Sequence, residues 1–307
     1  MTRPISLLFP GQGSQATGML TQDLISTYKD IIDEASNLTK IDFISLINND
    51  PENCLNKTSF TQPALLLTSY LYFLKFKSIV NINPTYMAGH SLGEYSALVA
   101  SDSIDFFDAL ELVHKRGLLM ESAPKGLMAA IMGLELSNLK DICSSVQTQL
   151  ESIVSCANLN SHSQTVIAGS ELAVNRVCSI AKESGAKRAI VLNVSVASHC
   201  ELMNEPASLF SDYLDKTNIT MPSTNVIHNY SAETSRNESE IKKNLVNQLT
   251  SSVKWFETMD EIKKNDSIVI ECGPGKVLQG LAKSNGISDI LSITTDDFES
   301  KLKDFYE

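Results

Sequence analysis

The chain has 307 residues, of which 43% are hydrophobic and 20% are charged, and its formal net charge is -11. This composition is typical of a globular protein with a sizeable core and excludes a largely disordered chain. The acidic balance argues against nucleic acid as a general partner, because the neutralisation of phosphates needs a basic face.

Short apolar strands alternate with helical patterns over the first 122 residues. Residues 5–9 predict a buried strand, which Pro10 and Gly11 terminate. The next predicted elements are helices at 20–36 and 63–78, a strand at 86–88, and helices at 92–100 and 104–122. This alternation indicates a large α/β domain.

Residues 125–196 follow a different order. The predicted elements are a strand (127–133), a helix (136–149), two strands (152–157 and 165–168) joined by an Asn-rich turn at 158–161, a helix (171–184) and a strand (189–194). The order β-α-β-β-α-β is that of a split ferredoxin-like unit. We therefore predict a small ferredoxin-like domain at 124–197, inserted into a large α/β domain formed by residues 1–123 and 198–307.

The α/β pattern resumes after residue 200, with strands predicted at 226–228 and 268–271. The tight turn from Cys272 to Gly275 leads into an expected final helix. Lys276 after this turn suggests a phosphate-binding loop. The turn lacks that motif's first glycine, and Val277 replaces its Ser or Thr, so we predict no nucleotide site there.

Gly89-His90-Ser91-Leu92-Gly93 matches G-x-S-x-G between a short strand and an amphipathic helix, the context of a catalytic serine. The glycines permit a tight turn, which lifts the Ser91 hydroxyl out of the backbone. The amide of Leu92 lies at the start of the helix, where it can stabilise an oxyanion. A helix-capping serine is the alternative, and we favour the nucleophile.

A serine nucleophile needs a base within hydrogen-bond reach, and the chain has five histidines. His199 lies where the predicted insert returns to the large domain, a junction that often lines a cleft. This position favours His199 as the base. The other four fit packing, structural or exposed positions: His90, His114, His162 and His228.

Arg116 falls on the buried stripe of the helix at 104–122, which is marked by Phe106, Ala109, Val113 and Met120. A guanidinium on a buried face needs a partner, and its planar fork suits a carboxylate. That carboxylate is either an internal Asp or Glu or part of a substrate, and the pattern alone leaves both open.

The cysteines lack the paired spacing of a metal site, so we expect reduced thiols, a cytoplasmic location and no bound metal. No stretch approaches the roughly 20 apolar residues of a membrane span, and the apolar run at 5–9 is too short for a signal peptide. We therefore expect no membrane partner. Nothing demands an oligomer, and we expect a monomer.

Seven marks follow one another along nearly the whole chain: Phe9 to Gln15 (FPGQGSQ), Gly89 to Tyr95 (GHSLGEY), Arg116-Gly117, Asn158-Leu159-Asn160, Val196 to His199 (VASH), Gln248, and Glu271 to Val277 (ECGPGKV). Together they resemble the malonyl-CoA:acyl carrier protein transacylase family and the related acyltransferase domains of polyketide synthases. The resemblance implies a hydrolase-like α/β large domain with a parallel sheet, a ferredoxin-like insert, and an active site in the cleft between them.

The resemblance also implies a role for each matching residue. These are an acylated nucleophile at Ser91, a base at His199, a main-chain carbonyl at Gln248 that orients the base, oxyanion-hole amides at Gln12 and Leu92, and a binder of the malonyl carboxylate at Arg116. Asn158, Lys187 and Arg188, beside the expected cleft, are predicted to contact the coenzyme A thioester or an acidic carrier protein.

The implied reaction moves malonyl from malonyl-CoA to the phosphopantetheine thiol of an acyl carrier protein of fatty acid synthesis, by ping-pong transfer and without a cofactor. Three alternatives stay open. The carrier can belong to a polyketide synthase, the enzyme can be a thioester hydrolase that passes the acyl group to water, or the chain can be a non-catalytic scaffold. Arg116 argues against the hydrolase, and the intact Ser91, His199 and Arg116 argue against the scaffold.

Overall fold

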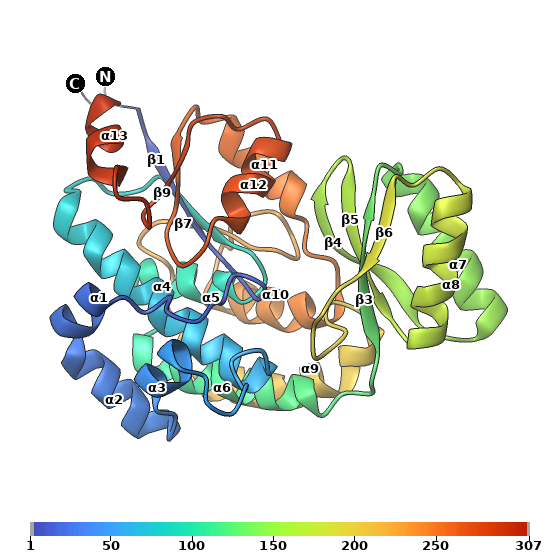
Figure 1. Cartoon of the computed structure of the whole chain (residues 1–307), viewed down its shortest axis with the longest axis horizontal. Helices are drawn as coiled ribbons and strands as arrows, with labels where there is room; N and C mark the ends of the chain where they lie inside the picture. Colours follow the sequence, from blue (N-terminus) through green and yellow to red (C-terminus); the bar gives the residue numbers. More distant parts are fainter. Residues whose placement is uncertain (1–2, 306–307) are drawn as a thin grey trace.

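Two β-sheets of different kinds organise the chain, whose computed structural model describes residues 3–305 (Figure 1). One sheet is parallel, and the order of its strands is β7 (Asn225–Ile227), β2 (Tyr86–Gly89), β1 (Ile5–Phe9), β8 (Ile268–Glu271) and β9 (Ile290–Ser292). The other is antiparallel, in the order β4 (Val154–Ser161), β5 (Gln164–Gly169), β3 (Leu127–Met132) and β6 (Arg188–Val191). The predicted α/β class with a parallel sheet is confirmed.

Helices cover both faces of the parallel sheet. They are α1 (Gln22–Thr27), α2 (Lys29–Thr39), α3 (Phe43–Asn48), α4 (Thr58–Ile79), α5 (Gly93–Ala100), α6 (Phe106–Glu121), α9 (Asn204–Lys216), α10 (Glu238–Thr250), α11 (Trp255–Lys263), α12 (Val277–Ser284) and α13 (Phe298–Asp304), with the short 3-10 helix η1 (Glu201–Met203). Successive side chains of β1 point to opposite faces. Leu7 packs into the core that includes α4, α5 and α6, and Leu8 into a second core with α11 and α12.

The register of the parallel strands determines which loops meet. Phe9 of β1 pairs with Gly89 of β2, and Ala88 of β2 pairs with Ile227 of β7. Because the carboxyl ends of parallel strands lie at one edge of a sheet, the segments after residues 9, 89 and 227 converge there. This edge carries most of the site described below.

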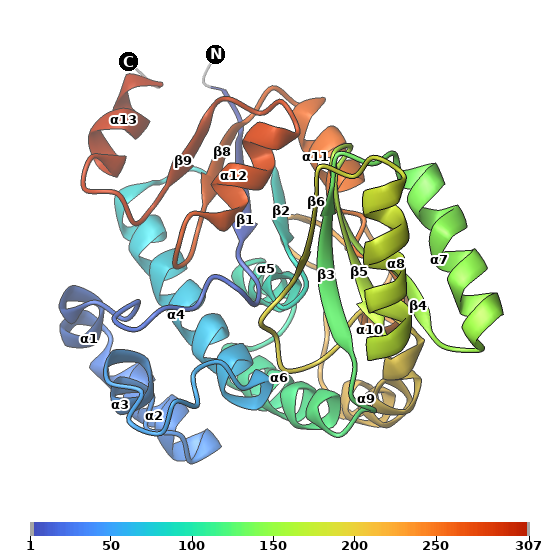
Figure 2. The same cartoon turned by 45° about the vertical axis from the view of Figure 1, so that its right-hand side comes forward.

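The antiparallel sheet and its two helices, α7 (Leu136–Leu150) and α8 (Glu171–Glu183), stand beside the parallel sheet. The helices cover one face of this sheet (Figure 2), where Ala129 and Ile131 pack against Leu139 and Val174. The opposite face packs against residues that follow β6, including Ala197 and Cys200. The small sheet is thereby attached to the segment that leads back to the large one.

Three local predictions were wrong. The expected single helix at 20–36 is divided at Tyr28 into α1 and α2. The expected turn at 158–161 belongs to β4, which continues through Ser161 with irregular register, because Asn158 and Leu159 pair with Val253 from the large unit. The helix after the Cys272 turn is not the last element, since β9 and α13 follow it.

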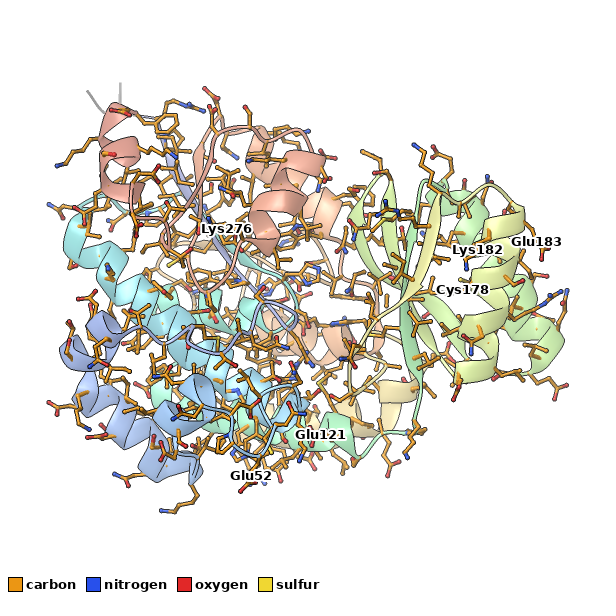
Figure 3. All side chains as sticks on the ribbon, viewed as in Figure 1. Glu52, Glu121, Cys178, Lys182, Glu183 and Lys276 are labelled. Atoms are coloured by element: carbon orange, nitrogen blue, oxygen red, sulfur yellow. The ribbon has the colours of Figure 1, made fainter. Side chains whose placement is uncertain are left out.

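The six cysteines are all free and buried, and they are spread over both parts of the fold. Cys178 lies on α8, remote from the turn before α12 that carries Lys276 (Figure 3). None of the helices within residues 3–305 combines the length and apolar character that crossing a lipid bilayer requires.

Candidate active site

Ser91 lies in the turn between β2 and α5. Its backbone φ is 51°, in the left-handed region that residues other than glycine rarely adopt. A Cβ on Gly89 would overlap the backbone of Gly93, and a Cβ on Gly93 would overlap the backbone of Phe9. The two glycines of the motif are therefore required by close backbone approach, and the turn presents the Ser91 side chain at the carboxyl edge of the sheet.

His199 is hydrogen-bonded to Ser91, although 108 positions separate the two residues. Its Nε2 lies 2.8 Å from Ser91 Oγ, and its Nδ1 lies 2.6 Å from the main-chain oxygen of Gln248. Because a carbonyl can only accept, Nδ1 carries the proton and Nε2 is left to accept from the serine hydroxyl. This is the arrangement of a nucleophile with its base, in which a peptide carbonyl orients the imidazole.

The imidazole of His199 is almost completely buried, with 2% of the residue exposed. Burial lowers the pKa of His199 to about 3; the hydrogen bond to the Gln248 carbonyl opposes this shift, and the positive charge of Arg116 adds to it. The ring is therefore neutral at physiological pH, as a base that takes a proton must be.

Two backbone amides beside Ser91 are available to bind an anion. Neither the amide of Gln12 nor that of Leu92 donates a hydrogen bond to any residue in the range 3–305. Both residues line the cavity next to Ser91. Gly11 allows the two segments to approach each other, because a Cβ there would overlap the main-chain oxygen of His90. These amides have the chemistry of an oxyanion hole.

The cavity next to Ser91 has a volume of about 80 Å³. The reactive pair and the Gln12 and Leu92 segments form one side of it. The rest of the wall is largely apolar and comes from Met120, Met128, Leu192, Val194 and Val196, with Gln62, His90, Asn158 and Ser198. The structure thus gathers residues from the parallel sheet, α6, the small sheet and the segment after β6.

Arg116 lies on α6 with 1% of its surface exposed. Its Nη2 donates to Gln248 Oε1 at 2.9 Å, and its guanidinium lies 5.4 Å from the centre of the Tyr95 ring. No Asp or Glu within residues 3–305 forms an ion pair with it, so the internal carboxylate considered from the sequence is not its partner. Burial lowers the pKa of Arg116. The guanidinium lies next to the site, behind Gln248, rather than in the cavity wall.

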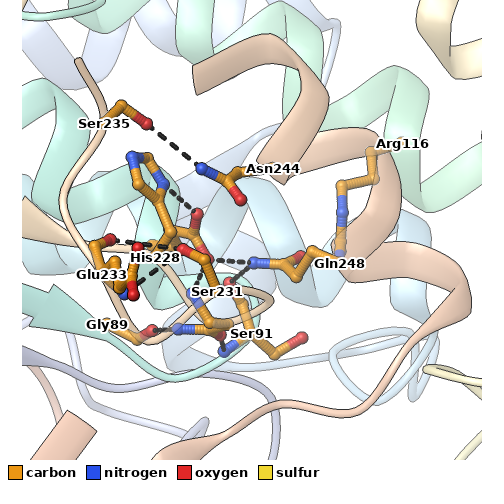
Figure 4. Close-up of polar contacts among 11 residues, drawn as sticks. Gly89, Ser91, Arg116, His228, Ser231, Glu233, Ser235, Asn244 and Gln248 are labelled. Atoms are coloured by element: carbon orange, nitrogen blue, oxygen red, sulfur yellow. Dashed lines mark hydrogen bonds and ion pairs between the residues drawn. The ribbon is translucent and has the colours of Figure 1, made fainter. Parts of the chain in front are cut away.

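A polar network that the sequence analysis missed supports the nucleophile turn (Figure 4). Asn229, two residues beyond β7, accepts a hydrogen bond from Ser91 N and donates one to Gly89 O, both at 2.7 Å. Glu94 accepts from His228, from Asn229 and from the side chain of Gln248. The one signal in the sequence is an acidic residue, Glu94, inside an otherwise apolar helix.

The remaining predicted residues are placed as follows. Asn158 lines the cavity, and its Oδ1 is buried without a hydrogen-bond partner in residues 3–305. Lys187 and Arg188 are exposed and pair with the Met132 end of β3, whereas the cavity lies at the Met128 end. They therefore lie at the end of β3 opposite to the one that lines the cavity. Their contact with a substrate or carrier stays a prediction.

The other histidines do not reach Ser91 through a hydrogen bond. His90 turns away from the hydroxyl, with Nε2 2.9 Å from Asn160 Oδ1 and its ring against Trp255. His228 is bonded to Glu94, and His162 is exposed, as expected. Across residues 3–305, no group of three or more His, Cys, Asp or Glu side chains is placed to hold a metal ion.

Known proteins share this architecture over its full length. Residues 7–292 match the family described as acyl transferase domain. The chain is 41% identical over 306 residues to the malonyl CoA-acyl carrier protein transacylase of Haemophilus influenzae, covering 97% of each protein. A malonyl CoA-acyl carrier protein transacylase from Coxiella burnetii superposes with a TM-score of 0.92 at 36% identity, over 100% of this chain and 98% of that one.

A second similar structure contains a partner protein. It is a malonyl-transacylase, PlMCAT, in complex with AntF, its type II polyketide synthase acyl-carrier protein. The similarity has a TM-score of 0.90 at 37% identity and covers 99% of both chains.

Proposed function

Since the chain belongs to the acyl transferase family, among the malonyl CoA-acyl carrier protein transacylases, we propose that it transfers a malonyl group from malonyl-CoA to an acyl carrier protein. The observation that carries this function is the hydrogen bond between Ser91 and His199, with the Nδ1 proton of His199 directed at the Gln248 carbonyl. In a chain that is 41% identical to a malonyl CoA-acyl carrier protein transacylase over nearly its full length, this pair supports acyl transfer through a serine ester.

The first half-reaction forms the ester. His199 Nε2 takes the hydroxyl proton as Ser91 Oγ attacks the thioester carbonyl of malonyl-CoA, and the carbonyl oxygen becomes an oxyanion that the amides of Gln12 and Leu92 stabilise. The carbon–sulfur bond then breaks, and the coenzyme A thiolate leaves with the proton that His199 had taken. The malonyl group stays on Ser91.

The second half-reaction reverses the roles. The phosphopantetheine thiol of the carrier protein gives its proton to His199 and attacks the ester carbonyl. The carbon–oxygen bond breaks, and the Ser91 oxygen takes back the proton from His199. The two half-reactions make a ping-pong cycle with a Ser-His dyad, and every bond change involves only the thioesters and these two side chains, so the proposed cycle uses no metal or other cofactor.

Arg116 is proposed to bind the free carboxylate of the malonyl group. The buried guanidinium of Arg116 forms no ion pair in residues 3–305. It places a positive charge next to the reactive pair, and Glu94 acts on this charge only from beyond the Gln248 side chain. An anionic acyl group would compensate that charge, whereas an acetyl group would not. This contrast favours malonyl transfer over transfer of uncharged acyl chains.

The finer description of the fold is also a proposal. The order β6-β3-β5-β4 and the chain order β-α-β-β-α-β support a ferredoxin-like small domain at 124–197, inserted into a hydrolase-like domain made of 1–123 and 198–307. We further propose that the protein acts as a monomer. Six free, buried cysteines support a reducing cytoplasmic location.

The carrier partner is proposed to be the acyl carrier protein of fatty acid synthesis. The complex of PlMCAT with its type II polyketide synthase carrier supports a second candidate, in which the enzyme loads polyketide carriers. Transfer rates to purified carriers of both kinds decide between them, since the true partner should give the lower KM.

The decisive experiment is mass spectrometry of the intact protein after incubation with malonyl-CoA. We expect one malonyl group on the wild-type protein, on Ser91, and none on Ser91→Ala. The adduct should disappear when a carrier protein is added, with malonyl appearing on the carrier. Rapid release of free malonate without any carrier would instead identify a hydrolase.

A further inference from the structure

Glu94 is a buried carboxylate that the proposed reaction does not use. It lies on α5, three residues after Ser91, and none of its surface is exposed. Burial of a carboxylate is costly unless hydrogen bonds or an opposite charge compensate it. Three donors do so here: His228 Nδ1 at 2.7 Å, the backbone amide of Asn229 at 3.0 Å and Gln248 Nε2 at 2.7 Å.

The side-chain amide of Gln248 has one allowed orientation in this network. Its Nε2 faces two acceptors, Glu94 Oε2 and the main-chain oxygen of Ser91 at 2.9 Å. Because a carboxylate and a carbonyl both accept, the amino end of the amide must point at them. The oxygen end is thereby turned towards Arg116, whose Nη2 donates to it (Figure 4).

Arg116 depends on that orientation. A guanidinium has only donors, so a reversed amide would direct an amino group at it and repel it. In the observed orientation, Gln248 Oε1 holds one end of the guanidinium, while Arg116 Nε has no hydrogen-bond partner within residues 3–305. The guanidinium therefore keeps donor capacity for a further acceptor.

We propose that Glu94 is a positioning residue for the recognition of an anionic acyl group. It fixes the polarity of the Gln248 amide, and this polarity keeps Arg116 in the position that receives the malonyl carboxylate. The inference rests on the proposed role of Arg116. Glu94 acts on acyl selection rather than on the base. His199 is held by the main-chain carbonyl of Gln248, and a reversal of the Gln248 side chain leaves that carbonyl in place.

The substitution Glu94→Gln tests this with almost no change in shape. Only one end of a carboxamide accepts, so it cannot accept from all three donors. Where the new amino end faces Gln248 Nε2, we expect the Gln248 side chain to reverse. Glu271→Gln is the matched control, because Glu271 is also fully buried and accepts two backbone amides at the start of α12, at Leu278 and Gln279. The readout is kcat/KM for malonyl-CoA divided by kcat/KM for acetyl-CoA, with Tm recorded for each variant.

We expect Glu94→Gln to lower this ratio by about tenfold or more, the effect of losing one hydrogen bond to a charged group. The loss should lie mainly in KM for malonyl-CoA. Glu271→Gln should lower Tm and leave the ratio unchanged. An unchanged ratio in Glu94→Gln, or an equal loss with both substrates, overturns the proposal.

A second variant tests the proposal in case Glu94→Gln does not fold. Gln248→Met removes the amide and keeps the main-chain carbonyl, and it should lower the same ratio; an unchanged ratio there also overturns the inference. A different result would contradict the proposed function itself: the wild-type protein would form no malonyl adduct on Ser91. If the adduct forms and both variants keep the wild-type ratio, only the role of Glu94 is lost.

Discussion

Ser91 and His199, whose side chains are hydrogen-bonded at 2.8 Å, both hold backbone φ angles in the left-handed region, at 51° and 63°. Such conformations cost about 1–3 kcal/mol each and persist only where the surrounding structure holds them. Asn229 does this for Ser91, and the main-chain oxygen of Leu249 accepts from the amide of His199 at 3.0 Å. The folded chain thus holds the nucleophile and the base in position before any substrate binds.

Asn229→Leu should lower the rate of acylation at Ser91 by about tenfold or more, because two buried hydrogen bonds across the turn are lost at about 1 kcal/mol each. The measurement is the single-turnover formation of the malonyl adduct. Asn244→Leu is the control, since within residues 3–305 the Asn244 side chain bonds Ser235 and no residue of the nucleophile turn (Figure 4). Equal rates in the two variants would show that Asn229 has no part in positioning the serine.

Arg116→Ala should lower kcat/KM for malonyl-CoA by about 10–100-fold, the worth of hydrogen bonds to a charged group, while acetyl-CoA is still accepted slowly. The exposed Arg176 on α8 supplies the control, and Arg176→Ala should keep the wild-type preference. Steady-state transfer with both thioesters measures the effect. If Arg116→Ala loses both activities equally, the arginine is structural.

The pH profile should lack an acid limb near pH 6.5, the ordinary pKa of a histidine, because burial lowers the pKa of His199 to about 3. We expect kcat/KM to stay level as the pH falls through 6.5. A limb with its midpoint near 6.5 would mean that the imidazole is solvated in the working enzyme.

The lowered pKa of His199 also makes the free energy of unfolding depend on pH. Between pH 3 and 6.5 the unfolded chain binds a proton at His199 that the folded chain does not, so the free energy of unfolding decreases as the pH falls below 6.5. Urea unfolding at pH 7 and pH 5 should show a smaller decrease in His199→Gln than in the wild-type protein. An identical decrease in both would contradict a neutral, buried His199.

Gly93→Ala should give little folded protein, because the added Cβ would overlap the backbone of Phe9. Gly280→Ala is the matched change on α12, where a Cβ meets nothing within 4 Å. It should raise the free energy of unfolding by up to about 1 kcal/mol through helix propensity. Thermal unfolding of the two variants checks both expectations, and a stable, active Gly93→Ala protein would refute the close packing of the turn.

Local patterns were sufficient for most of the fold. The strand–turn–helix around Ser91 and the β-α-β-β-α-β order after residue 125 depend on neighbours in the sequence, and the structure has both. The extension of β4 through Asn158 and Leu159 could not be predicted, because it depends on pairing with Val253, more than 90 positions away. An Asn-rich segment predicts a turn unless a distant partner makes it a strand.

The site residues also divide into those that a local motif marks and those that depend on distant partners. Ser91 is marked by its own pentapeptide, whereas the choice of His199 among five histidines needed its predicted place at the junction of two domains. Glu94 and Asn229 were missed because their partners are 134 to 154 positions and 138 to 140 positions away, respectively. Lys187 and Arg188 were predicted at the cleft end of the small sheet because the sequence does not show which end of β6 faces the cavity.

Part of the cavity wall comes from a different stretch of chain than the nucleophile and the two oxyanion-hole amides. Leu192, Val194 and Val196 belong to the segment that returns from the small sheet, and its Ser195 is tied to Thr58 of α4 at 2.7 Å. Ser91, Gln12 and Gln248 belong to the parallel-sheet half. Substitutions at Leu192 or Val194 can therefore widen or narrow the room for an acyl chain without touching Ser91 or the two amides, whereas Val196 stands only three residues before His199. Relatives of one ancestor can thus diverge in acyl donor while they keep the same nucleophile and base.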